Sequence, residues 1–306
     1  MKAFLAACLG LFLLHGATIA AADARSALVV DAAWLAAHVD DPDLVLLHVG
    51  DADEYADGHI AGARLVSLDA VSVSEHTRTG LMLQVPAAED LRSRLETLGV
   101  ADQSRVVVYY GSDWVSPATR VVFTLQQAGL GERTRLLDGG MPAWVRQGGK
   151  LNTAKPAAPT GTLSPLSMQD LVVDRAYVRA NLSTPGIAIV DGRAAAFYDG
   201  VDTGGAHGLA HRTGHIQGAR NVPYTAIADG QLLLRPQAEL RALFDQAGVK
   251  PGDTVIGYCH IGQQATAMLF AARLLGHPVK LYDGSFEDWS RGADHPVEVT
   301  ATAAQE

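Results

Sequence analysis

The sequence predicts an α/β fold used twice, as two tandem domains that each hold a mostly parallel sheet with helices on both faces. Short runs rich in Val, Ile and Leu alternate with helical patterns along the chain. Four segments recur in the same order in the two halves, and a stretch rich in Pro, Ala, Thr and Gly separates those halves. The length of 306 residues also suits about two domains.

The first half alternates buried strands with helices. In chain order the pattern predicts a strand over 44–49, a helix over 52–57, a helix over 86–98, a strand over 106–110, a helix over 118–127 and a strand near Leu136. Because the strands are apolar on both faces, we expect a parallel sheet that is covered on both sides. Ligands of such sheets bind beyond the carboxyl ends of the strands.

The second half repeats the first in four places. Gly-His-Ile-Ala-Gly-Ala-Arg at 58–64 matches Gly-His-Ile-Gln-Gly-Ala-Arg at 214–220. The other pairs are 46–55 with 189–198, 106–110 with 255–259, and 137–140 with 282–285, the last followed in each half by a tryptophan, Trp144 or Trp289. Four matches in one order are hard to produce by chance, so the halves share one architecture.

The ends and the joint of the chain carry their own patterns. Lys2, an apolar run and small residues near position 22 predict a signal peptide over 1–24 and export to the periplasm or the medium. The remaining layout is a first domain over 25–150, a linker over 151–166, a second domain over 167–298 and a tail over 299–306. Nothing downstream predicts a membrane span.

Cys8 stands in a segment similar to a lipoprotein cleavage box. Only seven residues precede it, too few for a charged region followed by an apolar one. We therefore do not expect a lipid anchor.

Without the leader the chain keeps one cysteine, Cys259, which follows the buried strand 253–258. An exported thiol without a disulfide partner is either an inert core residue or a nucleophile. The strand-to-helix turn favours the nucleophile, because loop N–H groups and the start of a helix near Gln264 can converge on an anionic sulfur. Gly262 would allow a sharp turn, and we expect the loop to lower the pKa of the thiol.

These motifs resemble the tandem-domain rhodaneses, sulfurtransferases that include thiosulfate and mercaptopyruvate enzymes. The resemblance covers nearly all of the mature chain. It rests on Gly-His-Ile-x-Gly-Ala in both halves, on Cys-x-x-Gly-x-x-Ala at 259–265, and on Asp-Gly-Ser-Phe-Glu-Asp-Trp at 283–289.

The resemblance implies that Cys259 takes the outer sulfur of a small anionic donor, thiosulfate or mercaptopyruvate, as a persulfide. The sulfur then passes to a thiol, cyanide or a protein acceptor. It implies no cofactor and no metal. The expected donor-binding residues are Arg193, His260, Ile261, Gly262, Gln263, Gln264 and Ala265, with Asp191 and His215 as structural neighbours.

The first half is expected to be catalytically silent and to pack on the second. Tyr110 stands where the second half has Cys259, and the loop after it is longer: eight positions lead from Tyr110 to Ala118, against six from Cys259 to Ala265. His215 has a counterpart, His59, in the silent half, so it is expected to be architectural.

Two features bear on the donor. Better-known relatives place an arginine where this chain has Phe197, so the use of thiosulfate stays open. Arg193 either clamps the anionic donor or pairs with Asp191 to brace the site. His260 adjoins the nucleophile and has no counterpart in the first half.

An insertion before the second Gly-His-Ile motif places His207, His211 and His215 four apart. That spacing suits metal ligands on one helix face, but the glycines between them favour a flexible flap over a metal site.

Two other functions remain as alternatives. A noncatalytic sulfur carrier or thiol-binding partner would also need the cysteine. A cysteine-dependent phosphatase would need an arginine that closes the loop, and Ala265 and Thr266 stand there instead. The formal net charge of −9 argues against nucleic acid as a partner.

Overall fold

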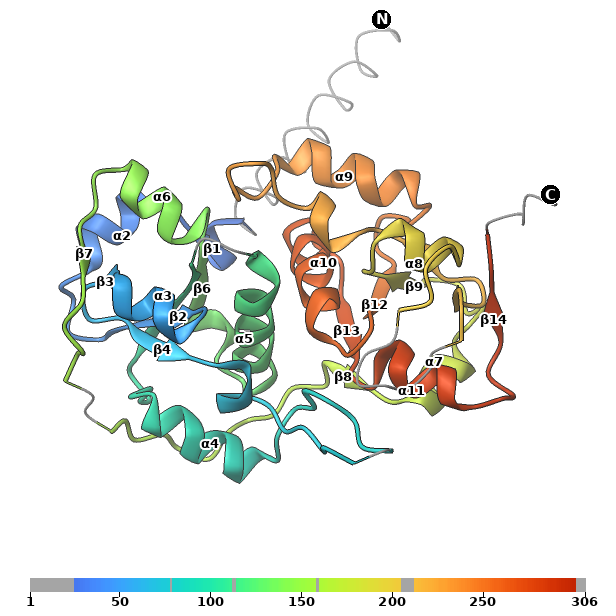
Figure 1. Ribbon diagram of the computed structural model, residues 1–306, viewed down its shortest axis with the longest axis horizontal. Coiled ribbons are helices and arrows are strands. Elements are labelled where there is room, and N and C mark those ends of the chain that lie inside the picture. The colour runs from blue at the N-terminus through green and yellow to red at the C-terminus, as the bar shows by residue number, and fades with distance from the viewer. Residues whose placement is uncertain (1–24, 78, 112–113, 158–159, 205–211, 301–306) are drawn as a thin grey trace, which may run out of the picture.

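The computed structural model describes residues 25–77, 79–111, 114–157, 160–204 and 212–300, and shows two α/β halves side by side (Figure 1). The first half contains, in chain order, β1 (Val29–Val30), α2 (Ala32–His38), β2 (Leu44–Val49), α3 (Ala52–Asp57), β3 (His59–Ile60), β4 (Arg64–Val66), α4 (Ala88–Thr97), β5 (Arg105–Tyr110), α5 (Val115–Gln127), β6 (Thr134–Leu137), α6 (Gly140–Arg146) and β7 (Leu151–Asn152).

The second half contains β8 (Val172–Val173), α7 (Arg175–Ala180), β9 (Ile187–Asp191), α8 (Ala195–Asp199), β10 (His215–Ile216), β11 (Arg220–Asn221), α9 (Gln237–Gln246), β12 (Thr254–Tyr258), α10 (Gln263–Leu274), β13 (Val279–Tyr282), α11 (Ser285–Arg291) and β14 (Val297–Glu298). Short 3₁₀ turns lie at Leu68–Ala70, Gly131–Arg133 and Tyr224–Ala226.

Each half is built on a five-stranded sheet in which all neighbouring strands are parallel. The order is β1-β6-β5-β2-β4 in the first half and β8-β13-β12-β9-β11 in the second, so the two sheets have the same topology. A two-stranded antiparallel ribbon accompanies each sheet, β3 with β7 and β10 with β14. The predicted duplicated α/β fold is confirmed.

The repeated motifs occupy equivalent places in the two sheets. His48 pairs with Tyr109 in the first half, and Asp191 pairs with Tyr258 in the second. Each tyrosine hydroxyl accepts the backbone N–H of the isoleucine in a Gly-His-Ile motif, in both cases at 3.1 Å. The next residue is Tyr110 in one half and Cys259 in the other, as the sequence alignment of the halves predicts.

The predicted elements correspond closely to the observed ones. β2 and α3 have the predicted bounds. The two tryptophans of the repeat are both buried, Trp144 at 7% exposure and Trp289 at 0%. Helix α5 begins at Val115, three residues before the predicted Ala118. Pro117 is compatible with this earlier start, because it falls in the first turn, where its missing N–H disrupts no helical hydrogen bond.

The linker over 151–166 is bound to the first half along part of its length. Its first two residues form β7, which pairs with β3. Further along, the Gly161 N–H donates to the Glu96 carbonyl at 2.8 Å, and Leu163 is buried at 3% exposure. Leu163 and these backbone contacts hold the described parts of the linker against the first half.

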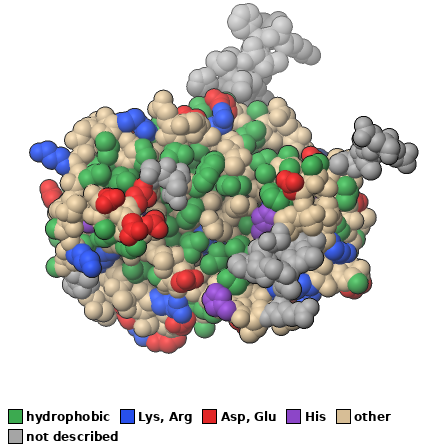
Figure 2. Space-filling view, in the orientation of Figure 1, with side chains coloured by type: hydrophobic (Ala, Val, Ile, Leu, Met, Phe, Trp, Pro, Cys, Tyr) green, Lys and Arg blue, Asp and Glu red, His purple; other side chains and the backbone are tan. Residues whose placement is uncertain are grey.

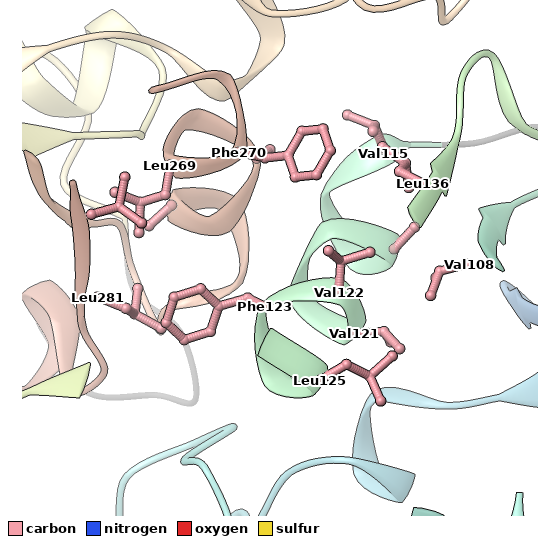
Figure 3. Close-up of a cluster of buried hydrophobic side chains, with 14 of the residues drawn as sticks. Val108, Val115, Val121, Val122, Phe123, Leu125, Leu136, Leu269, Phe270 and Leu281 are labelled. Atoms are coloured by element: carbon pink, nitrogen blue, oxygen red, sulfur yellow. The ribbon is translucent and has the colours of Figure 1, made fainter. Parts of the chain in front are cut away.

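The two halves share one hydrophobic core across their interface. Helices α5 and α10 face each other in the middle of the molecule (Figure 1). Phe123 of α5 extends toward Leu281 of β13, and Phe270 of α10 extends toward α5 (Figure 3). The hydroxyls of Thr119 and Thr266 meet between the helices at 3.1 Å. The expected packing of the first half on the second is thus observed.

Each half also supplies a backbone donor to the Asp-Gly turn of the other. The Asp138 carboxylate accepts the Leu234 N–H at 2.8 Å, and the Asp283 carboxylate accepts the Val85 N–H at 2.8 Å. The two equivalent contacts, one in each direction, are consistent with an approximate twofold symmetry between the halves.

The surface view shows Lys and Arg side chains lying apart from one another, among acidic and uncharged ones (Figure 2). In the described part of the chain, no helix combines the length and the apolar character that crossing a bilayer requires. The predicted signal peptide with Cys8, and residues 301–306 of the tail, lie outside the described residues.

Candidate active site

Cys259 lies at the carboxyl end of the second sheet, directly after β12. The chain turns through three residues, and α10 begins at Gln263, one position before the predicted start. Gly262 caps the helix with φ at +89°, a left-handed conformation that a side chain would strain. The strand therefore delivers the cysteine to the sheet edge where ligands of parallel sheets bind.

The sulfur atom of Cys259 is completely buried and faces backbone donors. The Gly262 N–H points at Sγ from 3.2 Å. Burial raises the pKa of the thiol, while the N–H groups of Ala265, Ile261 and Gly262 lower it without cancelling that effect. The predicted convergence of N–H groups is confirmed for these three residues. The predicted fall in pKa is wrong, because loss of water around a charged sulfur outweighs three backbone hydrogen bonds.

A cavity of about 330 Å³ is lined in part by Cys259. A larger cavity of about 500 Å³, beside Tyr282 and Arg175, does not include Cys259, so the smaller one is the candidate site. Four of the loop residues predicted to bind the donor line this cavity, whereas Gly262 and Ala265 do not. The lining residues are Phe197, Gly204, Cys259, His260, Ile261, Gln263 and Gln264.

The wall opposite the loop is apolar. The ring of Phe197 meets the His260 imidazole edge to face, with centroids 4.7 Å apart. Gly204 lies against both rings, because a Cβ there would be 2.8 Å from His260 Cε1 and 2.9 Å from Phe197. None of the described residues that line the cavity is Lys or Arg. The described lining therefore offers an anionic ligand no lysine or arginine.

Arg193 braces the site and does not line the cavity. Its guanidinium is 2% exposed, contacts the Asp191 carboxylate at 2.6 Å and donates to the Gly214 carbonyl at 2.7 Å. The plane of the guanidinium also lies over the Phe286 ring, 4.2 Å from its centroid. Of the two interpretations, pairing with Asp191 is the one observed. The expected donor clamp is not, because Asp191 and Gly214 already hold the guanidinium within the core.

His215 has the same surroundings as its counterpart in the silent half. Its ring stacks on Tyr198 at 3.7 Å, and Nδ1 contacts the Tyr198 carbonyl at 2.7 Å. His59 stacks on Tyr55 at 3.9 Å and contacts that carbonyl at 2.8 Å. This shared geometry agrees with an architectural role for His215.

Ser285 is a site residue that the sequence interpretation missed. It has φ at +53°, although it is not a glycine, and its Oγ accepts the Cys259 N–H at 3.3 Å. Strained residues of this kind are concentrated at functional sites. The signal was present in the repeat, because the matching position in the silent half is Gly140, with nearly the same φ of +54°.

Two further residues in the first turn of α11 also contact the loop after Cys259. The Phe286 N–H donates to the Cys259 carbonyl at 2.9 Å, and the Glu287 N–H donates to the His260 carbonyl at 3.0 Å. The first turn of α11 thus fixes the two residues that begin the loop.

The matching position in the first half is occupied by Tyr110. The Tyr110 ring is fully buried and packs where a side chain at position 140 would project, 2.7 Å from a Cβ built there. Its hydroxyl donates to the Leu232 carbonyl across the interface at 2.6 Å. His48, which stands where the second half has Asp191, stays neutral because burial lowers its pKa to about 4.

Within the described residues, no group of three or more His, Cys, Asp or Glu side chains is arranged to hold a metal ion. His207 and His211 lie outside the described residues, so the spacing of the three histidines has no structural counterpart here.

The chain is similar in sequence to known sulfurtransferases. The family description "Rhodanese-like domain" matches residues 31–147 and again 174–292. The chain is 32% identical over 276 residues to a thiosulfate sulfurtransferase of Pseudomonas aeruginosa, covering 89% of this chain and 97% of that protein. It is 33% identical over 281 residues to a 3-mercaptopyruvate sulfurtransferase of Escherichia coli K12, covering 88% and 97% respectively.

Among solved structures, an anaerobic ergothioneine biosynthesis enzyme from Chlorobium limicola superposes with a TM-score of 0.79 at 23% identity. The match covers 90% of this chain and 70% of that one, and shows the shared fold. Each matched segment contains four of the five strands of one sheet, and the two sulfurtransferases align across both segments. The chain therefore belongs to the rhodanese family and carries two copies of its domain.

Proposed function

We propose that this protein is a sulfurtransferase that carries a sulfane sulfur on Cys259. The observation behind this proposal is a single thiol at the end of β12, within a loop whose N–H groups face the sulfur and beside a cavity open to a small molecule. The two sulfurtransferases described above align with nearly 90% of this chain, which supports the same chemistry.

The reaction has two steps. In the first, the Cys259 thiolate attacks the outer sulfur of the donor; a new S–S bond forms, and the electron pair of the broken bond leaves with the rest of the donor. Thiosulfate releases sulfite, and mercaptopyruvate releases the pyruvate enolate, which takes up the proton that the donor thiol loses. In the second, a thiol, cyanide or protein acceptor attacks the outer sulfur of the persulfide, and the Cys259 thiolate leaves.

The cavity favours an organic donor over thiosulfate. Thiosulfate is a small dianion, and its desolvation is costly where no cationic group compensates it. The described lining includes no Lys or Arg, and Phe197 presents an apolar ring. A donor with one negative charge and a carbon skeleton, such as mercaptopyruvate, matches this lining better.

A noncatalytic sulfur carrier remains the second candidate. Phe197 and the absence of Lys and Arg from the described lining favour it, because a small anionic donor then has no cationic side chain to bind it. Steady-state turnover with small donors separates a carrier from an enzyme.

Export remains a proposal that the pattern of residues 1–24 supports. Intact mass of the protein recovered from separated cell fractions tests it. A mature chain that begins near Arg25, found outside the cytoplasm, is the expected result. A chain of 306 residues in the cytoplasm would contradict it.

Replacement of Cys259 by serine is expected to abolish sulfur transfer and leave the fold intact, because serine nearly conserves the volume of the residue but forms no persulfide. Intact mass is measured before and after incubation with mercaptopyruvate or thiosulfate, and again after cyanide. The wild type should gain one sulfur that cyanide removes. Cys8→Ser, at the other cysteine of the chain, should behave as wild type. Turnover retained by Cys259→Ser would rule out the mechanism.

Phe197→Arg is expected to raise kcat/KM for thiosulfate by about 10-fold, since one hydrogen bond to a charged group contributes about 1.5 to 3 kcal/mol. Phe197→Leu is the matched control, because it opens the wall without adding charge. An equal gain in both variants would attribute the effect to space, and no gain in either would show that this position does not face the donor.

The rate of alkylation of Cys259 is expected to rise about tenfold per pH unit from pH 7 to 9. Burial raises the pKa of the thiol, so the neutral form predominates at pH 7 and the reactive thiolate increases as the pH rises. The rate of iodoacetamide addition is followed by the mass of the peptide that contains Cys259. A plateau below pH 8 would contradict a raised pKa.

A further inference from the structure

Arg120 belongs to α5 of the silent half, yet its guanidinium lies against the active loop of the other half. The side chain is fully buried. It donates to three oxygens: the Leu83 carbonyl in its own half, the Asp283 carboxylate at 2.8 Å and the Gly262 carbonyl at 3.4 Å. One arginine therefore connects the two halves directly at the loop that follows Cys259.

Asp283 completes this connection. Its second carboxylate oxygen accepts the Val85 N–H at 2.8 Å, and its carbonyl accepts Nε2 of Gln84 at 3.0 Å. The side chains of the ion pair are 0% and 7% exposed for Arg120 and Asp283. Every contact named here on Asp283 comes from the silent half.

Gly262 lies between this ion pair and the sulfur. Its N–H donates to Cys259 Sγ at 3.2 Å, while its carbonyl accepts from Arg120. A Cβ at Gly262 would be 3.2 Å from Arg120 Nη1 and 3.2 Å from the Asp283 carbonyl oxygen. The left-handed turn at Gly262 is thus fixed by two contacts: its N–H binds the Cys259 sulfur, and its carbonyl binds Arg120 of the first half.

The arginine occurs only on the helix that faces the active loop. Counting from the matched alanines, Ala118 and Ala265, the counterpart of Arg120 on α10 is the buried Ala267. In the silent half the equivalent aspartate, Asp138, pairs instead with Arg25 at 2.7 Å. Arg25 also donates to the Leu234 and Arg235 carbonyls, both at 3.3 Å. Among the described residues, only the contact at Asp283 includes a carbonyl of the loop that follows Cys259.

Burial of the Arg120–Asp283 ion pair has a desolvation cost that reduces its contribution to the stability of the fold. A buried ion pair is often no more stabilising than an apolar pair of similar volume, and Nε of Arg120 is buried without a hydrogen-bond partner. A role beyond stability accounts for a fully buried guanidinium at this place.

We propose that Arg120 is a positioning residue for Cys259: through the Gly262 carbonyl and Asp283 it fixes the turn that aims a backbone N–H at the sulfur. The silent half thereby contributes to the reactivity of the thiol. This inference rests on the proposed use of Cys259 as the nucleophile.

Two variants of Arg120 test the proposal in the full-length protein. Arg120→Met removes all three contacts, while Arg120→Lys keeps a charge for Asp283 but cannot bridge three acceptors. For Arg120→Met we expect about tenfold slower alkylation of Cys259 at pH 8, with the whole pH profile moved about one unit to alkaline pH. We also expect kcat to fall about 10- to 100-fold, with a smaller change in KM. Arg120→Lys should recover part of both effects.

Asp138→Asn is the matched control, because it weakens the equivalent contact of the silent half, far from the sulfur in sequence and in the other sheet. It should lower Tm and leave the pH profile unchanged. If Arg120→Met does not fold, Arg120→Lys against Asp138→Asn carries the test. A lower Tm in the Arg120 variants with the wild-type pH profile and kcat would overturn the proposal.

Alkylation needs no sulfur donor, so the test also separates the two proposals. If the Arg120 variants show a displaced pH profile for alkylation and the wild type accepts no sulfur from any donor, the positioning role is supported and the sulfurtransferase function is refuted.

Discussion

The packing of α5 on α10 is the contact on which the rest of the structure depends. Helix α10 begins where the loop after Cys259 ends, so anything that fixes the helix also fixes the loop. Phe123 and Phe270 lie in the shared core between the halves, where each buried ring contributes about 1.5 to 3 kcal/mol. Because this core continues from one sheet to the other, the loop is supported by a single rigid interior.

The duplication separates what the fold requires from what the chemistry requires. The histidine stacked on a tyrosine and the tyrosine hydroxyl that accepts an isoleucine N–H occur in both halves, so they belong to the architecture. The halves differ at the end of the central strand, where Tyr110 stands in place of Cys259. They also differ in the turn after the next strand, β6 or β13, where Gly140 stands in place of Ser285. Tyr110 now joins the halves through its hydroxyl, so that position has acquired a structural role.

Features that depend on neighbours in the sequence could be predicted, and features that depend on distant contacts could not. Apolar strands, the repeated motifs and the position of Cys259 before a helix are local patterns. The contacts of Arg120 with Asp283 join residues 163 positions apart, and no local pattern encodes them. The direction of the Cys259 pKa escaped prediction for a similar reason: it depends on how completely folding removes water from the sulfur. The alternatives for Arg193 needed the observed Asp191 geometry to separate them.

Complete burial of the Cys259 sulfur also determines which oxidants can reach it. Thiol–disulfide exchange requires a second sulfur to approach along the axis of the bond that forms and breaks. A folded protein with a surface disulfide cannot bring that bond into a cavity of about 330 Å³, whereas a compound of a few atoms can enter. The walls of the cavity therefore act as a size filter. They slow the formation of mixed disulfides between Cys259 and other folded proteins.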